Sequence, residues 1–165
     1  MKKTATLMIL ILILIIVSCA TTQHVDYIIE DAAWSAVDAL EKNPGKTLAV
    51  YYFTSSDEND AELSKYISQG LTTQIANTIA EEELDIKIIS RQMLDQIMAE
   101  QSFQLSDLVD ETTQTEVGKI LGADLIMAGQ LSWIDDETCH LNAQIIEIET
   151  GVVLGGFLYD FWTDL

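Results

Sequence analysis

An alternation of polar and apolar residues predicts a three-stranded antiparallel meander in the last third of the chain. Within 138–148, apolar and polar side chains alternate along most of the stretch. A strand that buries only one of its faces requires this period of two. The acidic turn 135–137 and the turn 149–151 separate this strand from two others, which we predict at 124–134 and 152–157.

The alternation changes parity near the end of the middle strand. Apolar residues hold odd positions up to Ile145, whereas Ile146 and Ile148 hold even positions. We interpret this change as a β-bulge near Ile145 and Ile146, or as a strand that becomes buried on both faces there. The aromatic tail 157–165 also leaves two alternatives open: it completes the last strand, or it is an exposed docking peptide.

Helices and strands that cover or extend the meander are predicted upstream. Apolar residues at helical spacing indicate helices at 26–42 and 59–82. The first of these is either a packing element or a partner-binding amphipathic helix. Apolar runs predict strands at 47–54 and 85–89. A strand–helix–strand unit of this length implies a parallel pair with a right-handed crossover.

Two further helices are predicted before the meander. Ser90 is a suitable N-cap for a helix that runs to about Gln101. Thr113 and Glu116 have the spacing of a capping box for a helix that ends at Leu121. The predicted order is therefore α-β-α-β-α-α-β-β-β, a single α/β domain with a mixed sheet and a C-terminal antiparallel meander.

The N-terminal segment has the pattern of a bacterial lipoprotein signal. Lys2 and Lys3 precede an apolar run at 7–17, which is eleven residues long and well short of the roughly 20 residues that span a bilayer. The run ends in a lipobox, where a signal peptidase cleaves before a cysteine that becomes diacylated: Ile16, Val17, Ser18 and Cys19. The alternatives are an ordinary signal peptide with a chance cysteine, or an uncleaved anchor.

This interpretation divides the chain into three parts. Residues 1–18 are the signal peptide, 19–26 the lipidated cysteine with a short tether, and 27–165 a single α/β periplasmic domain. The tether keeps the domain near its membrane, because an extended chain spans at most about 3.5 Å per residue. Ala20 follows the lipidated cysteine where many inner-membrane lipoproteins have aspartate. We therefore expect an outer-membrane protein that faces the periplasm.

The chain is strongly acidic, with 27 Asp and Glu residues against 8 Lys and Arg residues. Its formal charge of −19 becomes −21 when Lys2 and Lys3 leave with the signal peptide. This charge argues against binding to nucleic acid, which depends on neutralising phosphates, and against electrostatic docking on anionic lipid. We expect membrane attachment through the acyl chains. Cys139 is then expected to be a small buried hydrophobe without a disulfide partner.

No pattern in the sequence predicts catalysis, a cofactor or a metal site. His24 falls in the predicted tether and His140 on the polar face of a strand, so neither belongs to a Cys/His/Asp triad. The acidic clusters at 57–60 and 135–137 lack the spaced ligands and the closing glutamate of an EF-hand. We therefore expect a protein that is not an enzyme.

Four short motifs resemble a superfamily of bacterial envelope lipoproteins. They lie at 89–95, 118–124, 129–131 and 149–151, with the sequences ISRQMLD, GKILGAD, GQL and ETG. The superfamily includes the CsgG-like curli-secretion proteins, the FlgO-like flagellar proteins and the LpoB-like activators of penicillin-binding proteins. The resemblance implies a mixed α/β domain like the N-terminal domain of TolB, with no known catalytic residues.

The resemblance also singles out individual motif residues. Gly122 is expected at a helix end, Gly129 at a close approach between strands and Gly151 in a turn. Arg91 is expected to pair with a carboxylate, such as that of Asp124 or Asp95, rather than to bind a ligand.

The anchor and the resemblance together predict a non-catalytic accessory or assembly factor that binds envelope proteins for a surface organelle or for secretion. One alternative is a regulator of a peptidoglycan synthase, and another is a ring-forming secretion component, which would be a homo-oligomer. The tight turns of the meander leave no membrane-crossing hairpins of the curli-channel kind. The short tether differs from the long stalk of the synthase activators.

Overall fold

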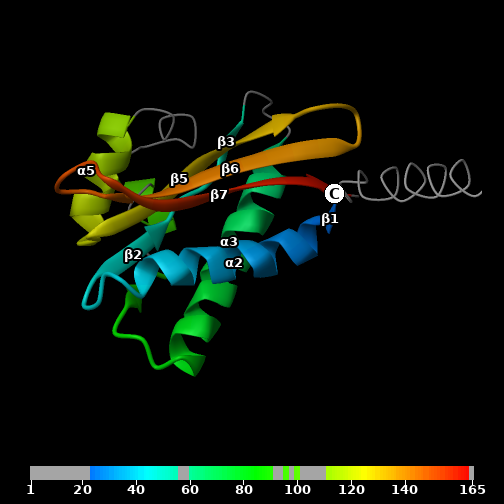
Figure 1. Ribbon diagram of the computed structural model, residues 1–165. Helices are drawn as coiled ribbons and strands as arrows, with labels where there is room; N and C mark the ends of the chain where they lie inside the picture. Colours follow the sequence, from blue (N-terminus) through cyan, green and yellow to red (C-terminus); the bar gives the residue numbers. More distant parts are fainter. Residues whose placement is uncertain (1–22, 56–59, 91–94, 97–98, 101–110, 164–165) are drawn as a thin grey trace, which may run out of the picture.

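A mixed β-sheet forms the centre of the protein (Figure 1). This computed structural model describes residues 23–55, 60–90, 95–96, 99–100 and 111–163. Within these residues the sheet has seven strands, in the order β1-β7-β6-β5-β2-β4, and β3 pairs with β5 outside this path. The strands are β1 (Gln23–His24), β2 (Thr47–Val50), β3 (Thr54–Ser55), β4 (Lys87–Ile88), β5 (Leu125–Trp133), β6 (Thr138–Glu147) and β7 (Val153–Trp162).

Strand β5 joins a parallel half of the sheet to an antiparallel half. It pairs in parallel with β2 and β3, and β2 pairs in parallel with β4. On its other side β5 pairs antiparallel with β6, which pairs antiparallel with β7. The predicted mixed sheet, the predicted parallel pair and the predicted meander are all confirmed.

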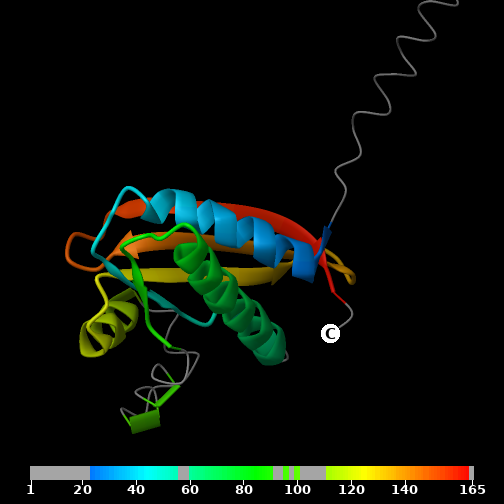
Figure 2. The same ribbon diagram turned by 90° about the horizontal axis from the view of Figure 1, so that it is seen from below.

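Helices α2 (Val25–Leu40) and α3 (Ala61–Glu81) cover one face of the sheet, as Figure 2 shows. The apolar stripe of α2 is buried in the main core, so this helix is a packing element. Each fully buried aliphatic side chain in such a stripe, for example Ile28 or Leu40, contributes roughly 1.5–3 kcal/mol. Helix α5 (Glu111–Leu121) packs in a second, smaller cluster with residues of β2 and β5. Alternation along the strands places this cluster on the opposite face.

Three predicted boundaries were wrong. Residues 23–26 were expected in the tether, but Gln23–His24 form β1, and α2 begins at Val25, whose side chain is buried. The predicted strand 47–54 is interrupted, because β2 ends at Val50 and β3 begins at Thr54. Helix α5 already includes Glu111, so Thr113 lies inside the helix and does not cap it. The predicted helix at 90–101 lies largely outside the described residues.

The parity change in β6 has a clear structural origin. The register between β6 and β7 shifts at Ile145 and Ile146, which pair with Gly155 and Val153 respectively. The extra residue is therefore Leu154 of β7, and the pairing of β6 with β5 continues without a shift. Ile145 belongs to the main core and Ile146 packs against the second cluster. The predicted bulge near Ile145 and Ile146 is confirmed as a register shift, with its extra residue in β7. The even position of Ile146 reflects its partial burial against the second cluster on the other face of β6.

The aromatic tail belongs to the fold. Strand β7 continues to Trp162, and the side chain of Phe161 is fully buried in the main core. Strand β1 pairs in parallel with this part of β7, with Gln23 opposite Phe161 and His24 opposite Trp162. The tail therefore completes the last strand, and it is not an exposed docking peptide within the described residues.

The closest backbone approach in the meander lies at Gly129 of β5. A Cβ atom built there would lie 2.1 Å from the carbonyl oxygen of Asn142 and 2.8 Å from the Cα of Ala143. Both atoms belong to the backbone of β6, which is held by its own pairing on either side. No side chain fits at this position without displacing one of the two strands.

The Gly129→Ala variant should lower the free energy of unfolding by about 3 kcal/mol or more, because overpacking against backbone is not relieved by side-chain rotation. The control is Gly122→Ala. Gly122 has φ +69° and no other atom within 4 Å of a built Cβ, so its loss should reflect only left-handed strain of about 1–2 kcal/mol. Urea unfolding of both variants measures the difference, and an equal loss would contradict the packing argument.

Cys139 lies on the covered face of β6 and its side chain is fully buried. Burial raises the pKa of the thiol to about 11, and the negative charge of Asp60 adds to this effect. The unfolded chain releases the same proton near the ordinary value of 9.0. The folded form thus favours the protonated thiol, and this contribution to stability is lost as the pH rises from about 9 to 11.

The Cys139→Ala variant should show a shallower loss of stability in alkaline solution than the wild type. The small cavity should lower its free energy of unfolding by about 1 kcal/mol at neutral pH. The gap between the two proteins should then narrow between pH 9 and pH 11. Urea unfolding over this range tests the prediction, and a gap that stays constant would count against it.

Candidate functional site

The three motif glycines lie at separate places in the structure. Gly122 follows α5 with φ +69° and Gly151 lies in the β6–β7 turn with φ +70°, both in the left-handed region that favours glycine. Gly129 lies at the close approach described above. Their positions match structural roles, and they do not converge on one pocket.

The carboxylate of Asp124 has a backbone partner. Its Oδ2 atom accepts a hydrogen bond of 2.8 Å from the backbone N–H of Thr47, which links the beginnings of β2 and β5. Asp95 accepts a hydrogen bond of 2.5 Å from the hydroxyl of Tyr52. Arg91 lies outside the described residues, so its pairing with either carboxylate stays a prediction.

The predicted lipidation site also precedes the described part of the chain. Cys19 and the lipobox residues Ile16, Val17 and Ser18 remain predictions from the sequence. Strand β1, which starts at Gln23, lies at the same end of the sheet as the last residues of β7. The predicted anchor is thus connected to that end. Among the described residues, no helix is both long enough and apolar enough to cross a membrane.

The described residues of the two acidic clusters include carboxylates that accept hydrogen bonds within the fold. Asp60 is buried and accepts hydrogen bonds from Ser55 and, over 2.9 Å, from the indole N–H of Trp133. Asp135 accepts from the backbone N–H groups of Glu137 and Thr138, and these hydrogen bonds lower the pKa of its carboxyl. The described residues contain no group of three or more His, Cys, Asp or Glu side chains placed to hold a metal ion.

The outer edge of β7 is the candidate interaction surface. Among the described strands, only β1 pairs with this edge, and it covers only Phe161 and Trp162. Residues 153–160, which we call the free edge of β7, have a neighbouring strand, β6, only on their inner side among the described residues. The opposite edge of the sheet is formed by β4, which differs from β7 because it is only two residues long and carries an exposed lysine, Lys87.

Helix α2 runs along this free edge. A Cβ atom at Gly155 would lie 2.6 Å from the Cβ of Ala39, and the hydroxyl groups of Tyr159 and Ser35 lie 3.3 Å apart. Toward the end of β7, the ring of His24, just before α2, contacts Trp162 edge-on at a centroid distance of 4.5 Å. Small residues on both elements allow this close approach, so α2 supports the strand without forming a pair with it.

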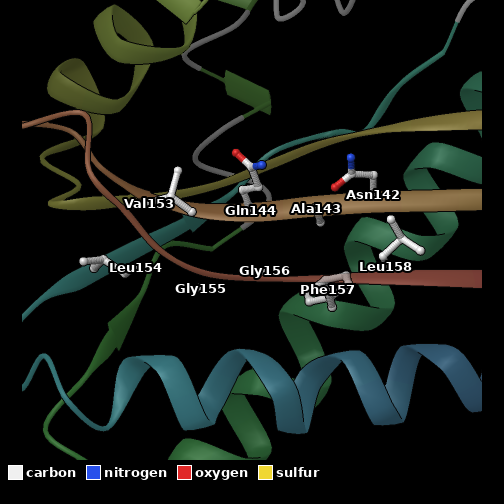
Figure 3. Close-up of a pocket in the computed structure, with 9 residues that line it drawn as sticks. All are labelled: Asn142, Ala143, Gln144, Val153, Leu154, Gly155, Gly156, Phe157 and Leu158. Carbon is white, nitrogen blue, oxygen red and sulfur yellow. The ribbon is translucent and has the colours of Figure 1, made fainter.

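A shallow open hollow lies across β6 and β7 (Figure 3). It has a volume of about 500 Å³, and its lining contains no charged side chain. Gly156 contributes no side chain, which leaves a gap between Val153 and Leu158. Asn142 and Gln144 point away from α2 on the same side of the sheet. Leu158 is the most exposed apolar side chain of this lining, at 61 %.

The surface beside the free edge is acidic and aromatic. The sequences of α2 and β7 contain no lysine or arginine. The exposed side of α2 instead presents acidic and aromatic side chains: Asp26, Tyr27, Glu30, Asp31, Trp34 and Asp38. Sequence reasoning did not identify this edge, because β1 was placed in the tether and the sequence left open whether the tail 157–165 completes the last strand. The signal that was available is the run 153–159, which has no charge and no proline.

Solved structures with the same fold include two of LpoB and one of a lipoprotein. The LpoB C-terminal domain from Salmonella enterica is 15% identical, with a TM-score of 0.58 over 81% of this chain and 98% of that domain. The solution structure of Escherichia coli LpoB is 15% identical, with a TM-score of 0.62 over 87% of this chain and 71% of that chain.

A third structure, the lipoprotein GNA1162 from Neisseria meningitidis, is 12% identical, with a TM-score of 0.52 over 71% of this chain and 80% of that chain. At these identities the likeness establishes a shared fold. A comparison with curated protein sequences finds no match.

One protein-family model matches more than half of the chain, and the match includes β2, α3, β4, α5 and β5. It begins at residue 45 and ends at residue 140, within β6. The motifs at 89–95, 118–124 and 129–131 fall inside this range. By this match the chain belongs to the CsgG family, described as the curli production assembly/transport component.

Proposed function

We propose that this protein is a lipid-anchored, non-catalytic accessory or assembly factor of the bacterial cell envelope that binds other envelope proteins. The observation that carries the proposal is its membership of the CsgG family, whose name refers to assembly and transport. The lipobox at 16–19 supplies an anchor, and a structure with the same fold is named a lipoprotein. An exposed strand edge beside an acidic helix offers a surface for a protein partner.

The proposed anchor holds the domain close to its membrane. Only three residues, that is four Cα–Cα steps, separate Cys19 from Gln23, the first residue of β1. An extended chain of this length spans about 14 Å. We propose that the protein faces the periplasm from the outer membrane, with the β1 end of the sheet toward the lipid. Partners would then be proteins that lie within reach of that surface.

A regulator of a peptidoglycan synthase is the second candidate. The observation that favours it is the fold likeness, which covers nearly all of the LpoB C-terminal domain. The short connection to Cys19 favours the accessory role instead, because a tether of about 14 Å does not reach across the periplasm. Adding the intact lipoprotein to a purified peptidoglycan synthase tests this candidate. A higher rate of synthesis would support it, and an unchanged rate would remove it.

The Cys19→Ala variant should carry no acyl group and should keep its signal peptide, because the thiol is the proposed acceptor of the lipid and cleavage before residue 19 depends on it. Cys139→Ala is the matched control: its thiol is buried in the core, so the variant should stay in the membrane. Fractionation followed by mass spectrometry of the N-terminal peptide measures both localisation and acylation. An acylated or normally cleaved N-terminus in Cys19→Ala would contradict lipid anchoring at this residue.

A pull-down of the intact lipoprotein, solubilised in detergent from its own membranes, should recover a defined envelope protein. Size-exclusion chromatography with light scattering on the same sample should show whether the lipoprotein is itself a homo-oligomer. If repeated pull-downs recover no protein partner, the proposed function is wrong. A closed ring of this chain alone would favour the secretion-component alternative.

A further inference from the structure

We propose that the free edge of β7 binds an extended, positively charged segment of a partner protein, which joins the sheet as an additional strand. The inference rests on the proposed function, since it requires a protein partner. It goes further by naming the surface, the backbone geometry and the charge of the segment. Three independent features of the described residues support it.

The first feature is the unpaired backbone. Residues 153–160 have no strand on their outer side within the described part of the chain. At about 3.3 Å per residue this edge is roughly 25 Å long, enough for a segment of several residues. Strand β1 already pairs with the last two residues of the same edge, Phe161 and Trp162. The edge therefore accepts a strand where one is supplied, and α2 does not block it there.

The second feature is the absence of edge protection. Exposed edges are usually made short, or carry lysine or proline, so that they do not pair with other chains. Strand β4 at the opposite edge follows this pattern, with two residues and an exposed Lys87. Residues 153–159 do not, since they contain neither a charge nor a proline, and the one charged residue of the free edge, Asp160 at its end, is hydrogen-bonded to His140 of β6. An exposed sheet edge without such protection is the kind of edge to which an extended peptide adds as a strand.

The third feature is the charge of the helix beside the edge. Asp31 and Asp38 lie four residues before and three residues after Ser35, so they share its side of α2. The hydroxyl of Ser35 contacts that of Tyr159 on β7, so both acids flank the edge. No basic residue belongs to α2 or β7. A cationic segment is attracted to this surface, whereas a second copy of the same acidic edge is repelled.

The alternation of side chains along a strand specifies the segment further. Successive residues of an added strand point to opposite faces of the sheet. On the open face their neighbours are Val153, Leu158 and the hollow above Gly156 (Figure 3), which favour apolar side chains. On the other face they approach α2 and its carboxylates, which favour lysine or arginine. The best segment therefore alternates apolar and basic residues.

The test uses the full-length lipoprotein in detergent and a fluorescent peptide of alternating valine and lysine. A peptide of alternating valine and glutamate tests the charge, and a valine–lysine peptide with proline at every second valine tests the backbone donors. Fluorescence anisotropy should show binding of the first peptide, weakened by salt, and binding at least about tenfold weaker for the other two. Hydrogen exchange should show new protection at 153–160 and none at β4.

The matched variants are a double substitution beside the edge and one away from it. Asp31→Asn with Asp38→Asn should weaken binding of the valine–lysine peptide about three- to tenfold. Glu81→Gln with Glu116→Gln removes the same charge from exposed positions on α3 and α5 and should leave the affinity unchanged. Equal affinity for both double variants would overturn the proposal. No binding at millimolar peptide would also overturn it.

Two further outcomes separate this inference from the function on which it rests. If protection at 153–160 instead rises with the concentration of the lipoprotein alone, the edge pairs with a second copy and the inference is wrong. If wild type and the Asp31→Asn, Asp38→Asn variant recover the same partner equally from membranes, the proposed function stands and the inference fails. If no form of the protein recovers a partner, the proposed function fails, whatever the peptide measurements show.

Discussion

The pairing of β5 on both of its sides is the interaction on which the rest of the structure depends. Its first residues pair in parallel with β2, and its whole length pairs antiparallel with β6. Apolar residues on its two faces enter different clusters: Leu125 and Met127 the main core, and Ile126 the second. A strand buried in this way satisfies its backbone groups only within the sheet, so its neighbours are held in one register.

Helix α2 turns this sheet into a domain with a usable edge. It contributes four alanines to the main core, and Ala39 lies directly over Gly155 of β7. Such short side chains let the helix lie close to the sheet, so the core is closed by a helix and no further strand is required. Within the described part of the chain, the outer backbone of β7 therefore remains unpaired along 153–160. The same packing that stabilises the fold thus leaves its main candidate interaction surface exposed.

Most of the architecture was predictable from the sequence, because the strand period of two and the helical spacing of apolar residues are both clear. The period of two identified the meander, and helical spacing identified α2 and α3 with their buried faces. The parity change at Ile145 and Ile146 correctly indicated a register shift, although the extra residue lies in β7. The errors concern short elements. The two residues of β1 have no period of their own, and their strand conformation comes only from pairing with Phe161 and Trp162.

The sequence by itself determined the fold class, the acidic character and the candidate anchor at Cys19, because composition and periodicity are properties of the chain before it folds. The tertiary structure alone decided which strand became the long unpaired edge, because strand order in a sheet depends on pairing between distant segments. It also decided that the acidic side of α2 lies beside that edge. The candidate site is therefore a property of neighbours in space, such as Ser35 and Tyr159, that are far apart in the chain.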